Sequence, residues 1–324
     1  MQVNDILSMI EKQRDEVEKE LLLNLDSDVQ MVNEVASYVF ESGGKRLRPV
    51  FLILSSLLCG YEGPRTAAIS GVVEYIHTAT LLHDDVIDGA LYRRGKESAN
   101  TVFGNDITVL CGDFLYSRAF MNLVKDGNPD IQMTLAVAAR TMSEGEVFQL
   151  IKTADIKITM DDYLKIINSK TAVLFSACCE IGALLGNESE EKRTALRDFG
   201  KNLGIAFQMS DDILDYLGDE AKTGKKPGTD LKEGKITLPV IVLLDNATDD
   251  EKKKVREIIV NENSDDENLH YIIDLMKKYD VKKKSEKILD SYSEKAKECL
   301  KLFPENKYRE ALESLADFMI KREK

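Results

Sequence analysis

Apolar residues recur at intervals of three and four along almost the whole chain, which aligns them on one face of an α-helix. This spacing predicts one helix over residues 72–87 and another over residues 161–185. The two-residue alternation that indicates strands is nearly absent, and no proline lies between residues 129 and 227. The pattern therefore predicts an all-α protein of ten or more helices.

Breaks between these helices are marked by glycine, proline and polar residues. They fall at residues 41–44, 60–64, 126–129, 186–190 and 218–234. No low-complexity linker divides the chain, so we expect a single domain over residues 1–324.

Composition is that of an ordinary globular protein, with 43% hydrophobic and 31% charged residues, but the formal net charge is −13. Such a charge opposes binding to a nucleic-acid backbone, so we expect no nucleic-acid partner. An anionic substrate would have to be met by a local cluster of cations or by bound metal.

The cysteines and the N-terminal residues indicate the cellular compartment in which the protein works. The five cysteines are scattered without paired spacing, which is typical of a reducing environment. The first residues carry charges where a signal peptide has an apolar core, and no apolar run reaches the length of a membrane span. We expect a soluble, cytoplasmic protein without stable membrane insertion.

The first candidate for chemistry is an acidic cluster formed by Asp84, Asp85 and Asp88. On a helix, positions i and i+4 lie on one face, so the first and last of these carboxylates point together and repel each other. Apolar neighbours such as Leu82 and Val86 draw this turn toward the core. Carboxylates held together in this way favour a hard cation such as Mg²⁺.

A second cluster, Asp211, Asp212 and Asp215, repeats this spacing and its apolar filling. For a single cluster, an acidic helix face turned toward water is an equally good interpretation. Two copies, each followed by cations, favour metal-bound diphosphate instead.

Cations follow both clusters and also occur near the N-terminus. Arginine pairs with phosphate oxygens through two parallel hydrogen bonds, and glycine-rich loops with cations suit anions. The candidates are Lys45, Arg48, Arg93, Arg94, Lys170, Lys225 and Lys235. Taken singly, each lysine is as well explained by a solvated surface charge. His77, on the Asp84 side of its helix, is either a buried core residue or a ligand of substrate diphosphate.

Together these segments resemble the trans-polyprenyl diphosphate synthases, from about residue 43 to residue 239. The resemblance lies in seven motifs in series: GGKRLRP, HTATLLHDDVIDGALYRRG, GDFLYSRAF, GEVFQL, KTAVLF, FQMSDDILDYLGD and GKKPGTDLKEGKITLP. It implies a large single-domain helical bundle of the isoprenoid synthase type around a central cavity. It also implies a head-to-tail prenyltransferase that adds isopentenyl diphosphate to an allylic diphosphate, with farnesyl or geranylgeranyl diphosphate as primer.

Site residues follow from the same resemblance. About three Mg²⁺ ions would be held by Asp84, Asp88 and Asp211, with Asp85 and Asp215 in support. The allylic diphosphate would be clamped by Arg93, Lys170, Lys225 and Lys235. Isopentenyl diphosphate would be held without metal by Lys45, Arg48, His77 and Arg94. Lys170, Thr171 and Gln208 are the predicted catalytic group, and the last two would lie near the developing carbocation.

Product length is expected to depend on side chains one turn before the first cluster. Family members with short products carry bulky aromatics there, whereas this chain has Ala79 and Thr80. The resemblance therefore implies a long all-trans product, between hexaprenyl and decaprenyl with octaprenyl favoured, for quinone side chains and released to the membrane. Candidates for a tunnel floor, each also readable as ordinary core, are Phe120, Met121, Met133 and Met142.

Several alternatives remain. A shorter-chain geranylgeranyl synthase would differ mainly in product length. A terpene cyclase would lack the isopentenyl pocket, and a squalene-synthase-like enzyme would have different motif flanks. An inactive partner subunit would not need two intact acidic clusters. Family members are usually homodimers, which we also expect here.

Overall fold

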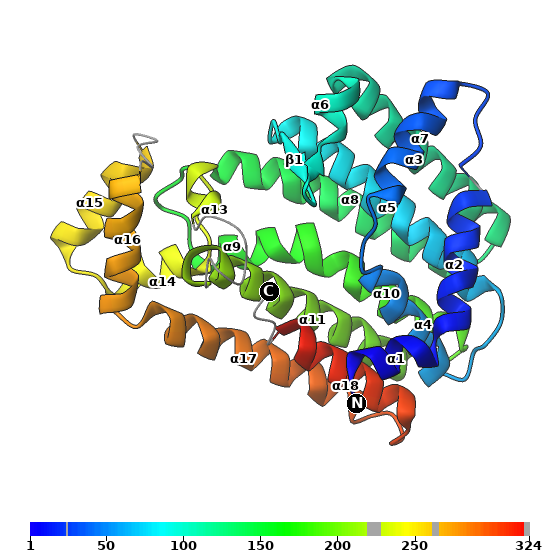
Figure 1. The fold of residues 1–324 in the computed structure, drawn as a ribbon. Coiled ribbons are helices and arrows are strands. Elements are labelled where there is room, and N and C mark those ends of the chain that lie inside the picture. The colour runs from blue at the N-terminus through cyan, green and yellow to red at the C-terminus, as the bar shows by residue number, and fades with distance from the viewer. Residues whose placement is uncertain (24, 219–227, 261–265, 321–324) are drawn as a thin grey trace. The chain divides into compact units, whose positions relative to one another are not determined.

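A computed structural model describes residues 1–23, 25–218, 228–260 and 266–320. Helices dominate, which confirms the predicted all-α fold (Figure 1). In the N-terminal part they are α1 (Val3–Met9), α2 (Glu11–Leu23), α3 (Gln30–Glu41), α4 (Leu47–Leu58), α5 (Arg65–Ile87), α6 (Ala99–Phe103), α7 (Asn105–Asp126) and α8 (Pro129–Lys152). The remainder are α9 (Met160–Ile167), the π-helical segment η1 (Asn168–Ala172), α10 (Val173–Leu185), α11 (Glu190–Leu217), α13 (Thr229–Lys232), α14 (Leu238–Asn246), α15 (Asp249–Val260), α16 (Asp266–Lys278), α17 (Val281–Leu300) and α18 (Lys307–Ile320).

The chain forms two compact units. Unit 1 comprises residues 1–139, 177–197 and 303–312, and unit 2 comprises residues 140–176, 198–302 and 313–324. Each unit is assembled from segments that are distant in the sequence. The expectation of a single domain over the whole chain stays a prediction.

Unit 1 is organised around α5, which packs against α2, α4 and α7 (Figure 1). Helix α4 buries every residue from Pro49 to Leu58, most of them apolar, as expected of a helix enclosed by others. The buried Tyr75 hydroxyl of α5 donates a 2.7 Å hydrogen bond to the carbonyl oxygen of Leu21, which fixes α5 to α2. Helix α5 is thus a rigid support for the residues at its C-terminal end.

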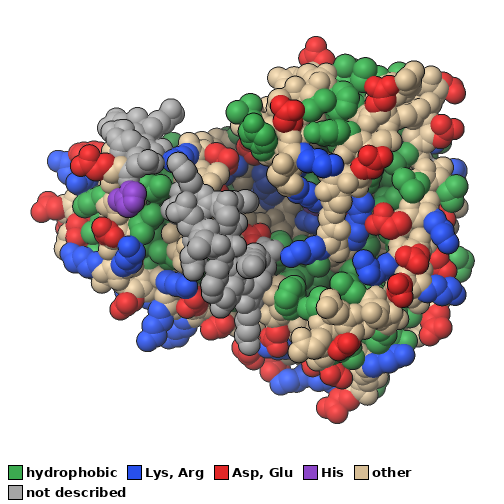
Figure 2. All heavy atoms as spheres, in the orientation of Figure 1, with side chains coloured by type: hydrophobic (Ala, Val, Ile, Leu, Met, Phe, Trp, Pro, Cys, Tyr) green, Lys and Arg blue, Asp and Glu red, His purple; other side chains and the backbone are tan. Residues whose placement is uncertain are grey.

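In unit 2, α14 contacts α9, α16 and α17. The amphipathic helices α16 and α17 turn residues such as Ile272 and Leu289 inward and leave charged residues outside. On the face shown in Figure 2, side chains of both charge signs are interspersed with apolar ones. No helix in the described ranges is long and apolar enough to cross a lipid bilayer.

Two local features differ from the sequence-based expectations. The helix expected over residues 161–185 contains η1, where the hydrogen bonding widens to a π-helical pattern, which apolar spacing cannot reveal. A two-stranded antiparallel hairpin, β1 (Tyr92–Arg93) and β2 (Lys96–Glu97), follows α5 and is too short to show alternation.

The interpretation of Phe120, Met121 and Met133 as ordinary core is wrong, because their side chains are 49%, 51% and 65% exposed. Met142 is buried. The cysteine pair Cys178 and Cys179 is also buried, and burial raises the pKa of the second thiol to about 12, as expected for inert core thiols.

Candidate active site

The first acidic cluster lies where α5 ends in unit 1. The amide of Ala90 donates to the carbonyl of Asp85, and the amide of Gly89 donates to that of Val86. This is a Schellman motif, which needs a left-handed residue directly after the helix, and Gly89 supplies it with a φ of 60°. The Asp-Asp-x-x-Asp-Gly sequence thus ends the helix and places its carboxylates on the last turn.

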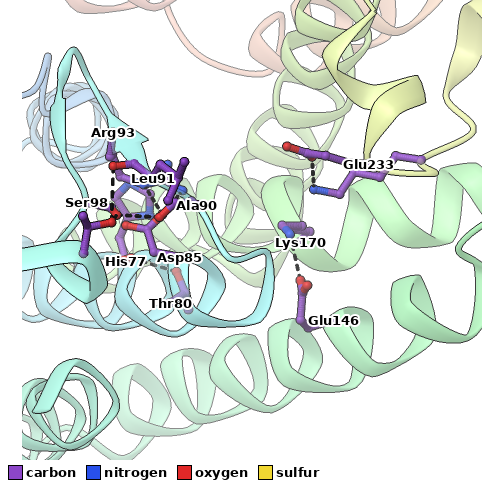
Figure 3. Close-up of polar contacts among 12 residues, drawn as sticks. His77, Thr80, Asp85, Ala90, Leu91, Arg93, Ser98, Glu146, Lys170 and Glu233 are labelled. Carbon is purple, nitrogen blue, oxygen red and sulfur yellow. Dashed lines mark hydrogen bonds and ion pairs between the residues drawn. The ribbon is translucent and has the colours of Figure 1, made fainter. Parts of the chain in front are cut away.

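The three carboxylates of this cluster are not equivalent. Asp84 is half-buried and Asp88 is exposed, one turn apart on the same face. Asp85 is 3% exposed, and one of its oxygens accepts a 2.6 Å hydrogen bond from Nε of Arg93 (Figure 3). Asp85 therefore holds an arginine, while Asp84 and Asp88 lie together as candidate metal ligands.

Arg93 and Arg94 are presented by the hairpin. Arg94 has a φ of 53° and Gly95 a φ of 79°, the pair of positive values typical of a type I′ turn. A left-handed arginine is unfavourable by about 1 kcal/mol, and such strain is concentrated at functional sites. Its guanidinium donates to the carbonyl oxygen of Gly43, in the glycine-rich segment just before the predicted ligand Lys45.

The hairpin is fixed at its ends. The buried Ser98 hydroxyl donates a 2.5 Å hydrogen bond to the carbonyl of Ala90 (Figure 3), and Tyr38 donates one to the carbonyl of Glu97. The two arginines are thus held by bonded backbone on both sides.

Arg48 and His77 lie together in unit 1, as the sequence predicts. Nη1 of Arg48 is 3.0 Å from Nε2 of His77. A guanidinium only donates, so this imidazole nitrogen accepts and the ring proton lies on Nδ1. Burial, reinforced by Arg48 and Arg94, lowers the pKa of His77 well below its usual value. His77 is therefore a neutral partner that orients a cation.

Arg46 was not among the predicted site residues. It anchors the segment that leads into α4. It donates to Glu18 at 2.9 Å and to the buried Glu74 at 3.1 Å, and it has a left-handed φ of 45°. Burial raises the pKa of Glu74, while Arg46 opposes that rise. The sequence did contain a pointer to this contact, because Glu74, the partner of Arg46, lies three residues before His77 and therefore on the same side of the helix.

Lys170 and Thr171 lie in the π-helical segment η1 of unit 2. Nζ of Lys170 is 2.8 Å from a carboxylate oxygen of Glu146 on α8 (Figure 3). The Thr171 hydroxyl donates a 2.8 Å hydrogen bond to Oε1 of Gln208 on α11, so this predicted pair is brought together. Lys235 pairs with Glu233 at 2.7 Å, and Lys225 lies outside the described residues.

The three carboxylates of the second acidic cluster, on α11, also differ in their surroundings. Asp211 and Asp215 are half-buried, and one oxygen of Asp215 accepts the amide of Asp230 at 3.1 Å. Asp212 is 4% exposed and accepts from Tyr163 and Gln208. Burial raises the pKa of Asp212 to about 6, and the hydrogen bonds from Tyr163 and Gln208 oppose that rise.

Each unit contains a pocket beside these residues. In unit 2 the pocket is lined by Gln149, Lys152, Thr153, Ile158, Tyr163, Ile166, Ile167, Lys170, Thr171, Gln208, Asp212, Asp230, Lys235, Ile236 and Thr237. In unit 1 a smaller pocket is lined by Tyr38, Val39, Ser42, Leu81, Leu82, Asp85, Arg93, Arg94, Glu97, Ser98 and Ala99. Of the predicted substrate-binding cations, Arg93, Arg94, Lys170 and Lys235 thus border concave surfaces.

Among the described residues, no three His, Cys, Asp or Glu side chains converge into a preformed metal cage. The donors present are carboxylate oxygens such as those of Asp84 and Asp88. Mg²⁺ accepts one or two carboxylates and completes its shell with water and substrate phosphate. The residues therefore fit a metal that arrives together with a diphosphate.

Carboxylates at a helix end, with arginines nearby on a helical scaffold, suit a highly charged anionic substrate. Comparison with known proteins identifies the class: residues 29–276 match the family model of the polyprenyl synthetases. The chain is 38% identical over 304 residues to octaprenyl diphosphate synthase from Escherichia coli K12, covering 94% of each chain.

Two solved structures are also similar. Decaprenyl diphosphate synthase from Rhodobacter capsulatus has a TM-score of 0.95 at 35% identity and full coverage of both chains. A Caulobacter crescentus polyprenyl synthase, solved with calcium and isoprenyl diphosphate, has a TM-score of 0.94 at 37% identity, with 100% and 98% coverage. The chain belongs to the polyprenyl synthetase family. Its activity is that of a polyprenyl diphosphate synthase, a prenyltransferase, as the sequence predicts.

Proposed function

We propose that the protein is a long-chain elongase that condenses isopentenyl diphosphate onto farnesyl or geranylgeranyl diphosphate and releases a product of about octaprenyl length. The observation that carries this proposal is the paired Arg48 and His77 beside the Arg94 hairpin. A cyclase acts on one diphosphate and needs no such second anion site, whereas an elongase needs two.

Isopentenyl diphosphate is proposed to bind in unit 1. Burial lowers the pKa of both Arg48 and Arg94, because desolvation penalises their charged forms, and the carboxylate of Glu74 opposes that lowering. A bound diphosphate would remove this penalty and accept several charge-assisted hydrogen bonds. The neutral His77 would keep Arg48 oriented, and the exposed Lys45 would close over the anion.

The metal ligands are proposed, from the family resemblance, to be Asp84, Asp88 and Asp211, with Asp85 and Asp215 in support. These carboxylates suit Mg²⁺, and about three ions would serve one allylic diphosphate. When bound, such ions stabilise the negative charge that develops on the diphosphate as the allylic C–O bond breaks.

The cations Arg93, Lys170 and Lys235, with Lys225, are proposed to clamp the allylic diphosphate. The first three are paired with Asp85, Glu146 and Glu233, which hold their charged groups in place. A diphosphate carries more negative charge than a carboxylate and would compete for the same donors.

Carbon–carbon bond formation then needs positioning rather than a protein base. The isopentenyl double bond attacks the allylic carbon as its bond to the diphosphate oxygen breaks, and the released diphosphate takes the proton lost from the new chain. Thr171 and Gln208 would place oxygen atoms beside the positive carbon. Holding both substrates in one geometry supplies a large part of the rate enhancement.

The direct test is elongation with purified protein, Mg²⁺, farnesyl diphosphate and radiolabelled isopentenyl diphosphate. We expect labelled prenyl alcohols of about octaprenyl length after phosphatase treatment, and no product when a chelator removes the metal. Label confined to geranylgeranyl products would favour the shorter-chain alternative. Label that never enters a chain longer than the primer would contradict elongation.

A homodimer is proposed from an apolar patch in unit 1. Isolated exposed apolar residues are common, but a contiguous group marks an interaction surface. The patch comprises Val102, Val109, Leu110, Phe120, Met121, Val124, Met133 and Val137 on α6, α7 and α8, each at least 37% exposed. Its α7 members recur at helical spacing and form one face. A second copy of the chain would bury this face.

We expect Leu110→Glu to convert a dimer into the 36.4 kDa monomer, because a carboxylate would be buried in an apolar contact. Light scattering measures the mass directly. Leu22→Glu on α2 is the matched control, since Leu22 is 67% exposed against 66% for Leu110 but lies outside the patch. An unchanged mass for Leu110→Glu would contradict this interface. A cytoplasmic location stays a prediction, which cell fractionation would test.

A further inference from the structure

Asp212, the middle carboxylate of the second acidic cluster, is bound by protein donors at both of its oxygens. The Tyr163 hydroxyl donates to Oδ2 at 2.6 Å, and Nε2 of Gln208 donates to Oδ1 at 2.9 Å. Tyr163 and Asp212 are only 2% and 4% exposed. A carboxylate engaged in this way is poorly placed to coordinate metal.

These hydrogen bonds determine which end of the Gln208 amide faces Asp212. An ionised carboxylate only accepts, so the NH₂ group of Gln208 must point toward it. The amide oxygen then lies on the other side, where it accepts the Thr171 hydroxyl at 2.8 Å. The hydroxyl hydrogen of Thr171 is used in this bond. Only the lone pairs of its oxygen therefore remain for a further polar contact.

Close packing keeps this chain of hydrogen bonds in place. A Cβ atom added to Gly204 on α11 would lie 2.5 Å from Cα of Ala172, so only glycine lets α11 approach the π-helical segment so closely. Thr171 is 7% exposed and borders the same pocket as Gln208 and Lys170. The orientation of the Gln208 amide thereby determines how the Thr171 hydroxyl is oriented at the wall of the pocket.

We infer that Asp212 and Tyr163 are positioning residues that set the polarity of the Gln208–Thr171 pair, so that oxygen atoms rather than N–H groups face the carbon that becomes positive. This role rests on the proposed elongation chemistry. If the amide were reversed, its N–H groups would face Thr171 and the developing charge, which would disfavour ionisation.

The test exchanges donor and acceptor. Asp212→Asn supplies an NH₂ group that can donate to Oε1 of Gln208 and so reverses the Gln208 amide. The double variant Gln208→Glu/Asp212→Asn restores an acceptor toward Thr171, keeps the net charge and leaves an acceptor for Tyr163. We expect kcat to fall about 10²-fold in the single variant and to recover at least tenfold in the double variant. The Mg²⁺ concentration for half-maximal activity and the KM for isopentenyl diphosphate should not change.

A binding measurement gives a readout that is independent of turnover. The probes are an allylic diphosphate analogue with an ammonium group in place of the reacting carbon, and its uncharged counterpart. Calorimetry should show the preference for the charged analogue falling about tenfold in Asp212→Asn and returning in the double variant.

Two outcomes would overturn the inference. One is a double variant no more active, and no more selective for the charged analogue, than Asp212→Asn. The other is an increased Mg²⁺ requirement in Asp212→Asn, which would identify Asp212 as a metal ligand. Wild-type protein that does not elongate but prefers the charged analogue would contradict the proposed function while leaving the positioning role intact.

Discussion

Asp84→Asn is expected to lower kcat for chain elongation by about 10³-fold or more, equivalent to about 4 kcal/mol of transition-state stabilisation. Asp84 is half-buried on the last turn of α5, one turn before Asp88, and Asp85 between them is bound to Arg93. The substitution preserves shape and removes the charge that metal binding requires. Steady-state assays across a Mg²⁺ titration measure the effect, and excess metal should restore activity only in part.

Three comparisons make this result specific. Asp15→Asn, the same change at an exposed position on α2, should leave kcat unchanged. Asp211→Asn should resemble Asp84→Asn. Asp85→Asn should have a smaller effect on kcat and act mainly on allylic diphosphate affinity, because Asp85 holds Arg93. Equal Mg²⁺ dependence in Asp84→Asn and wild type would contradict its role as a ligand.

The different partners of Asp84 and Asp85 illustrate what the sequence could predict. Helical periodicity located α5, and the Asp-Asp-x-x-Asp spacing placed Asp84 and Asp88 on one face. The pairing of Asp85 with Arg93 could not be predicted, because it depends on how a hairpin of two-residue strands folds back. A contact set by a turn leaves no periodic signal.

The same limit applies in unit 2. Lys170, Thr171 and Gln208 were predicted from motifs, and the structure brings the last two within hydrogen-bond distance. Tyr163 escaped detection because it lies 49 residues from its partner Asp212 and has the spacing of an ordinary core residue. Long-range hydrogen bonds between buried polar groups need the fold before they can be recognised.

The exposed methionines show a limit of a different kind. Met121 and Met133 are apolar residues, so hydrophobicity alone would assign them to the interior, but both are exposed. Whether an apolar helix face is covered by the same chain or by another copy depends on the neighbouring helices. Periodicity describes a face, and only the packing says what covers it.

Thr80→Phe is expected to shorten the product by several isoprene units while leaving the rate of the first condensation within a few-fold of wild type. Thr80 is half-buried, one helical turn before Asp84 and on the same face of α5. A ring there would narrow the path proposed for the growing chain without touching the carboxylates. Chromatography of dephosphorylated products gives the length distribution, and single-turnover kinetics give the first step.

Thr80→Val is the matched control. It removes the 2.7 Å hydrogen bond from the Thr80 hydroxyl to the carbonyl of His77 and adds almost no volume, so product length should not change (Figure 3). Ala79→Tyr should also shorten the product, but Ala79 is 0% exposed. A ring there must displace packed side chains at a cost of about 1–3 kcal/mol, so a lower Tm should accompany the effect. Full-length product from a folded, active Thr80→Phe variant would show that the chain does not grow past this turn of α5.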